Sequence, residues 1–119
     1  MDDAEQVEYL EEIADLRRRA RVLEEAQGSA ELIAEYMVEV QLLESLLLAA
    51  RELRDQLIQE PELGEMLLLR GFSPASFQDV YSFVYEAAME IDLSGEQLAR
   101  AVSGTDFASL LRRPDAVSG

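Results

Sequence analysis

Carboxylates are the most abundant reactive groups in this sequence, and several stand in pairs or at helical spacing. Adjacent pairs occur at Glu11–Glu12 and Glu24–Glu25, and a row with steps of four follows at Glu31, Glu35 and Glu39. Acid–base catalysis by two carboxylates needs an enclosed cleft that drives their pKa values apart. On the polar face of a helix, water keeps both groups ionised, so we interpret these acids as a solvated surface.

The other groups that catalysis and metal binding commonly use are missing from the sequence. Histidine, cysteine and lysine do not occur, which excludes a Ser–His or Cys–His pair, a Cys/His zinc site and a disulfide framework. Glu44 is the one acid that interrupts an apolar stripe, but a carboxylate metal site also needs several inward acids and usually histidine. We therefore predict no catalytic residue, no metal and no cofactor. An enzyme that uses only carboxylates and tyrosines is the weakest alternative.

Positive charge is concentrated in one segment. All ten basic residues are arginines, and four of them stand at Arg17–Arg19 and Arg21. We interpret this cluster as a solvated helix face that pairs with nearby acids, with Arg18 the least obviously paired. The alternative is docking of an acidic partner or a phosphate by three of these residues: Arg17, Arg18 and Arg21.

The overall charge limits the partners. The 25 acidic residues outweigh the basic ones to give a net charge of −15, which repels nucleic acid and anionic lipid. We expect no direct nucleic-acid or membrane partner. The same charge permits imitation of nucleic acid, with Glu31, Glu35 and Glu39 as phosphate surrogates. The acidic N-terminus and the lack of a long apolar run predict a cytoplasmic chain.

The elements that position these groups are all predicted to be helices. Apolar residues recur at steps of three and four, and no strand-like alternation occurs. We expect Gly28 to adopt the left-handed conformation, Ser73 and Thr105 to cap helices, and residues 94–97 to form a capping box. The predicted helices cover residues 3–26, 30–59, 61–70, 74–90, 94–102 and 106–112.

The first two predicted helices fold back on each other at Gly28. Facing residues then have numbers that sum to roughly 56, a register that brings opposite charges together. The expected pairs are Arg17 with Glu39, Arg21 with Glu35, and Asp2 and Asp3 with Arg54 and Arg51. We therefore predict an antiparallel hairpin over residues 1–60, a small helical subdomain over 61–113 packed on it, and a flexible tail over 114–119.

The middle of the second helix is apolar nearly all round. Only Glu44 and Ser45 are polar between Leu42 and Ala50, so one neighbouring helix cannot cover it. Either the C-terminal helices or a second copy must do so, and we favour a homodimer that forms a four-helix bundle. The predicted interface is Leu42, Leu43, Leu46, Leu47, Leu48 and Leu53. The function that these observations favour is a non-catalytic protein–protein interaction module, such as an adaptor, assembly factor or regulatory subunit.

Overall fold

A computed structural model describes residues 3–113, with side chains from residue 5 onward. The described residues form six helices and no strand, which confirms the all-α prediction. The tail predicted to be flexible, residues 114–119, lies outside the described residues. The helices are α1 (Asp3–Glu25), α2 (Ala30–Gln59), α3 (Pro61–Leu69), α4 (Phe77–Met89), α5 (Gly95–Ser103) and α6 (Phe107–Arg112).

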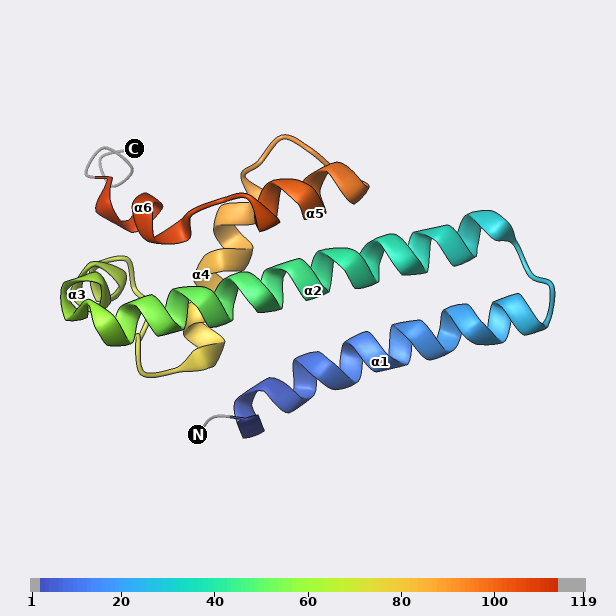
Figure 1. Ribbon diagram of the computed structural model, residues 1–119, viewed down its shortest axis with the longest axis horizontal. Helices are drawn as coiled ribbons and strands as arrows, with labels where there is room; N and C mark the ends of the chain where they lie inside the picture. The colour runs from blue at the N-terminus through green and yellow to red at the C-terminus, as the bar shows by residue number, and fades with distance from the viewer. Residues whose placement is uncertain (1–2, 114–119) are drawn as a thin grey trace.

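Helix α2 is the central element, and each of the other five helices packs on it. Helix α1 lies along one side of α2, and the chain reverses its direction between them at residues 26–29 (Figure 1). The shorter helices gather around the middle and the C-terminal part of α2, so the first turns of α2 and the end of α1 extend beyond them. The molecule is consequently elongated, with extents of 51 × 33 × 19 Å.

The turn between α1 and α2 differs from the predicted one in which residue is left-handed. Gln27 has the positive φ, 55°, whereas Gly28 does not. The Gly28 amide donates to Leu23 O at 2.7 Å and the Gln27 amide to Glu24 O at 3.1 Å, which is a Schellman arrangement with Gln27 at C′. A Cβ added at Gly28 would lie 2.9 Å from Leu23 Cδ2 and 3.2 Å from Leu23 O, so the Leu23 side chain would have to shift. Ser29 caps α2 as predicted by accepting from the Leu32 amide.

Helix α3 begins with Pro61 and ends before Gly71, as predicted, and Gly71 has a φ of 92°. The prediction for α4 was wrong at its start, because the cap is Ser76 and not Ser73. The Ser76 side chain accepts from the Asp79 amide, while the Asp79 carboxylate accepts from the Ser73 amide at 2.7 Å. These two bonds hold residues 73–76 in a turn, so the helix starts three residues later.

Two further cap predictions were wrong. The Ser94 side chain makes no cap hydrogen bond at the start of α5, where Gly95 has a φ of 61°. At α6 the cap is Asp106, which accepts from the Ser109 amide. Thr105 instead donates its hydroxyl to Ala101 O at 2.6 Å and so joins α6 to the end of α5.

The core lies between α2 and the inner faces of its neighbours. Aromatic rings join α1 to α4, since Tyr9 stacks on Tyr81 with centroids 4.2 Å apart and meets Phe77 edge-on. The largest fully buried side chains come from α2, α3, α4 and α5: Phe77, Leu46, Leu53, Leu63, Leu67, Val40, Val80, Val84 and Val102.

The charge register between α1 and α2 also differs from the predicted one. Arg17 pairs with Glu44 rather than with Glu39, about one helical turn further along α2. Arg51 donates its Nε proton to Gln6 Oε1, and Gln6 is buried. The predicted partners Asp2 and Asp3 have no described side chains.

Candidate interaction surfaces

The chain itself covers most of the apolar segment that was predicted to face a partner. Leu46, Leu47 and Leu53 are buried, with exposed fractions of 0%, 4% and 1%. Leu42 and Leu43 are half-buried against the same core. Of the six leucines only Leu48 is exposed, at 52%. The C-terminal helices therefore provide the cover, and a second copy is not required for it.

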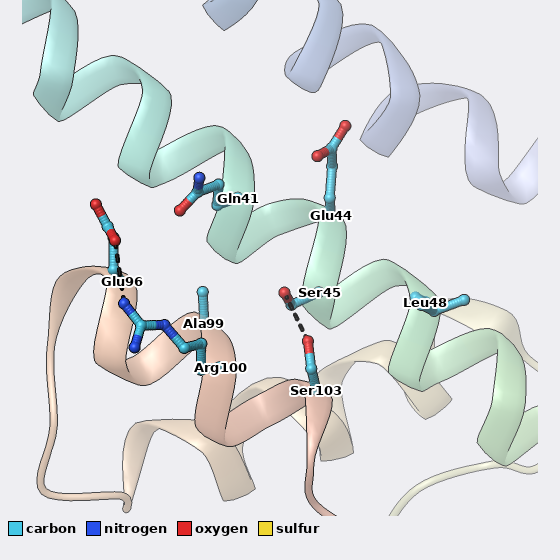
Figure 2. A pocket seen from close by; sticks show the side chains of 8 residues that line it. All are labelled: Gln41, Glu44, Ser45, Leu48, Glu96, Ala99, Arg100 and Ser103. Carbon is cyan, nitrogen blue, oxygen red and sulfur yellow. Dashed lines mark hydrogen bonds and ion pairs between the residues drawn. The ribbon is translucent and has the colours of Figure 1, made fainter.

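Leu48 borders an open groove between α2 and α5, shown in Figure 2. Polar side chains and the apolar Leu48 and Ala99 line the groove together. Across it, the Ser103 hydroxyl donates to Ser45 Oγ at 3.2 Å, and within α5 Arg100 pairs with Glu96 at 3.2 Å. Both hydroxyls lack the basic partner that nucleophilic catalysis needs. We interpret this groove as a polar contact between two helices that leaves Leu48 at its edge.

The arginine cluster is more fully paired than the sequence indicates. Arg17 pairs with Glu44 across the two long helices. Arg18 pairs with Asp15 at 2.8 Å and Arg19 pairs with the same carboxylate at 2.9 Å, so the prediction that Arg18 is least paired was wrong. Because one carboxylate serves two guanidinium groups, this part of α1 keeps an excess of positive charge.

The predicted acidic row is exposed along α2. Glu31, Glu35 and Glu39 all face solvent and occupy successive turns of the helix. The arginines of α1 lie on the neighbouring helix at the same level, since Arg17 and Arg21 line a hollow with Ile33 and Met37. The acids therefore form a single row beside positive charge rather than a continuous negative surface.

Only a few groups in residues 5–113 have a clearly perturbed pKa. Burial raises the pKa of Tyr81, helped by the nearby charges of Tyr9 and Glu12, and burial likewise raises the pKa of Tyr9. Hydrogen bonds from Ser109 lower the pKa of Asp106 at the start of α6. These shifts have structural causes, namely aromatic packing and helix capping. Within the same residues, no cluster of three or more potential metal ligands occurs.

A groove that sequence reasoning missed lies between the end of α3, α4 and α6. We call it the α3–α6 groove. Phe72 and Phe83 meet edge-on in its wall with centroids 5.8 Å apart, and Leu110 and Ala87 extend the apolar lining. Leu69 stands at its rim and is 86% exposed. Charged groups border the apolar wall: Arg70, Glu86, Glu90 and Arg113.

Arg70 fixes the shape of this groove. Its guanidinium donates to Leu110 O at 2.8 Å, which ties the end of α3 to α6. The same guanidinium lies 5.8 Å from the centre of the Phe83 ring, within the range of a cation–π contact. The groove is consequently held from two sides, so its apolar wall is preformed.

One sequence signal pointed to this groove. Leu67, Leu68 and Leu69 are consecutive, and successive helical residues lie about 100° apart around the axis. All three cannot face the same core, and only Leu67 does; Leu68 and Leu69 are exposed at 56% and 86%. The other walls come from Phe72, Phe83 and Leu110, which the fold alone brings together.

Comparison with known proteins finds no family model, no curated protein and no solved structure that matches this chain. In addition, none of the helices in residues 3–113 is long and apolar enough to cross a membrane. The surfaces of the chain itself are therefore the observations that bear on its function.

Proposed function

We propose that the chain is a non-catalytic protein-binding module, an adaptor, assembly factor or regulatory subunit, and that the α3–α6 groove receives an apolar segment of its partner. The observation that carries the proposal is the exposure of Leu69 beside a preformed aromatic wall. Burying a leucine side chain contributes roughly 1.5–3 kcal/mol, so a partner that covers Leu69 binds with a more favourable free energy. Exposed apolar surface with a charged rim is typical of protein contact sites.

The organisation of the chain is part of this proposal. We infer that residues 1–60 act as an antiparallel hairpin and residues 61–113 as a small subdomain that presents the groove. The packing of α1 on α2 and the short connection at residues 26–29 support this division. The hairpin would then be free to make a separate contact.

A nucleic-acid mimic is the less supported alternative. Glu31, Glu35 and Glu39 are exposed, but mimicry needs two ordered rows of negative charge, and arginines occupy the adjacent helix. Binding by a mimic would weaken steeply with added salt, whereas binding through the α3–α6 groove would change little. Measuring the affinity for the isolated partner at two salt concentrations separates the two functions.

Photo-crosslinking tests the proposed function. A photoreactive amino acid is placed at Leu69 and, as the control, at Leu93, which is 45% exposed outside the groove. In cells that naturally produce the chain, we expect one discrete protein adduct from position 69 and none of that size from position 93. The identified partner is then purified, and its affinity for variants of the chain is measured by calorimetry.

With that partner, Leu69→Ser should weaken binding by about tenfold or more, as is usual for a central apolar contact. Leu93→Ser should change the affinity by less than about twofold. Absence of a discrete adduct from position 69, or an equal loss of affinity in both variants, would show that the groove is not a protein-binding site.

A further inference from the structure

The outward face of α1 is a helix surface that the described residues leave uncovered. Helix α1 packs on α2 and touches α4 with its inner side, and Figure 1 shows it at the edge of the molecule. Away from this inner side, six residues at helical steps are all exposed, and the last two also border a hollow with Leu32 and Tyr36 of α2: Val7, Leu10, Glu11, Ala14, Arg18 and Val22. The three largest apolar members, Val7, Leu10 and Val22, have exposed fractions of 44%, 45% and 58%.

Charge is divided between two segments of this helix. Residues 8–12 carry Glu8, Glu11 and Glu12, residues 17–21 carry Arg17–Arg19 and Arg21, and the helix then ends with Glu24 and Glu25. Asp15 pairs with both Arg18 and Arg19, so the segment 17–21 keeps a positive excess. The acidic segment 8–12 is complementary to the basic segment 17–21 of a reversed copy, while Glu24 and Glu25 lie beyond Val22 and outside the contact. A parallel copy would instead place arginine against arginine.

We propose that two copies of this chain associate through the outward faces of α1, with the two α1 helices antiparallel. The spacing of the exposed residues on α1 then sets the register, in which the numbers of two facing residues sum to roughly 29. Glu11 lies opposite Arg18 of the second copy, and Val7 lies opposite Val22 of the second copy. Ala14 lies beside the two-fold axis, where its small side chain lets the helices approach closely.

The size of this face indicates a weak dimer. From Val7 to Val22 the helix extends about 22 Å at 1.5 Å per residue, and one helix face of that length buries less than the roughly 800 Å² per partner of a standard interface. The order of acidic and basic segments along α1 selects the antiparallel orientation, and the apolar residues contribute the contact area. The α3–α6 groove takes no part, so this inference does not depend on the proposed function.

Paired charge reversals test the association. Sedimentation equilibrium of the full chain up to about 1 mM should detect a dimer, because even a weak association populates the complex at that concentration. Arg18→Glu and Glu11→Arg should each weaken the dimer by about tenfold, since every dimer contains the reversed pair twice. Mixing the two variants should restore association, because each then meets an opposite charge, and the double variant on one chain should also dimerise.

Two variants control for the change in net charge. Arg100→Glu and Glu52→Arg make the same charge changes at exposed positions outside α1, and they should leave the dimer within about twofold of the unmodified chain. Circular dichroism checks that every variant remains helical. A monomer throughout the concentration range, an equal effect of the controls, or failure of the mixture to associate would each overturn the proposal.

Discussion

Gln27 shows how a single residue adopts a conformation that its type disfavours. Its φ of 55° is left-handed, because the Schellman bonds of Gly28 and Gln27 to the last turn of α1 require that geometry at C′. A residue with a side chain is less stable there than glycine by about 1 kcal/mol. The glycine of this turn stands at the next position, Gly28, where an added Cβ would press on the Leu23 side chain.

Gln27→Gly should therefore raise the free energy of unfolding by about 0.5–1 kcal/mol, measured by urea denaturation. The matched control is Gln41→Gly, an exposed position inside α2, where glycine should lower it by about 1 kcal/mol. Opposite signs for the same substitution would establish that conformation at the C′ position decides the effect. A loss of stability in both variants would contradict this account.

The burial of Tyr81 makes the stability of the fold depend on pH in the alkaline range. Burial, then the charges of Tyr9, Glu12 and Tyr85, raise its pKa above the ordinary value of 10.0. The unfolded chain then loses this proton first, so the stabilisation is complete below pH 10 and is lost as the pH rises beyond it. The sequence has no lysine and no cysteine, so tyrosines dominate the titration in this range.

Tyr81→Phe should lose less stability than the unmodified chain between about pH 8 and about pH 11, measured by urea denaturation at each pH. Phenylalanine keeps the stacking on Tyr9 and removes the titrating hydroxyl. Tyr85→Phe, on an exposed residue of the same helix, should follow the unmodified chain closely. Identical pH profiles for Tyr81→Phe and the unmodified chain would show that Tyr81 does not cause the alkaline loss.

At the scale of elements, α2 illustrates why adjacent leucines have different roles. Leu47 is 4% exposed among the helices of the core, whereas Leu48 is 52% exposed at the edge of the α2–α5 groove. Leu47→Ala should lower the free energy of unfolding by about 2–5 kcal/mol, because it removes buried contacts and leaves a cavity. Leu48→Ala should change it by less than about 0.5 kcal/mol. Similar losses in both variants, measured by denaturation, would mean that Leu48 is covered in solution.

Periodicity was sufficient to predict the helices but not how they meet. The limits of α1, α2 and α3 follow from apolar spacing, Ser29 and Pro61, all of which act locally. The start of α4 was misplaced because the Asp79 carboxylate binds the Ser73 amide and makes Ser76 the cap. The α3–α6 groove depends on residues far apart in the chain, Phe72, Phe83 and Leu110, so no local pattern reveals it.

At the scale of the whole molecule, uneven charge is the dominant electrostatic feature. The chain carries a net charge of −15. Of its ion pairs, Arg17–Glu44 joins α1 to α2, Arg112–Glu60 joins α6 to the end of α2, and others lie within α1 or α5, but their side chains are 39–76% exposed. Pairs so exposed contribute only about 0–1 kcal/mol each, while an excess of one charge destabilises a folded chain through self-repulsion. We therefore expect repulsion to outweigh attraction in the stability of the monomer.

Added salt should for this reason stabilise the fold. Raising NaCl from about 0.05 M to about 0.5 M shortens the distance over which charges interact and screens the widely spaced acids most effectively. The thermal unfolding midpoint, measured by circular dichroism at a concentration too low for a weak dimer, should rise by a few degrees. KCl at equal concentrations should give the same rise, because screening depends on ionic strength rather than on the ion. A midpoint that falls with salt would instead mean that the exposed ion pairs, led by Arg17 with Glu44, stabilise the monomer more than its excess charge destabilises it.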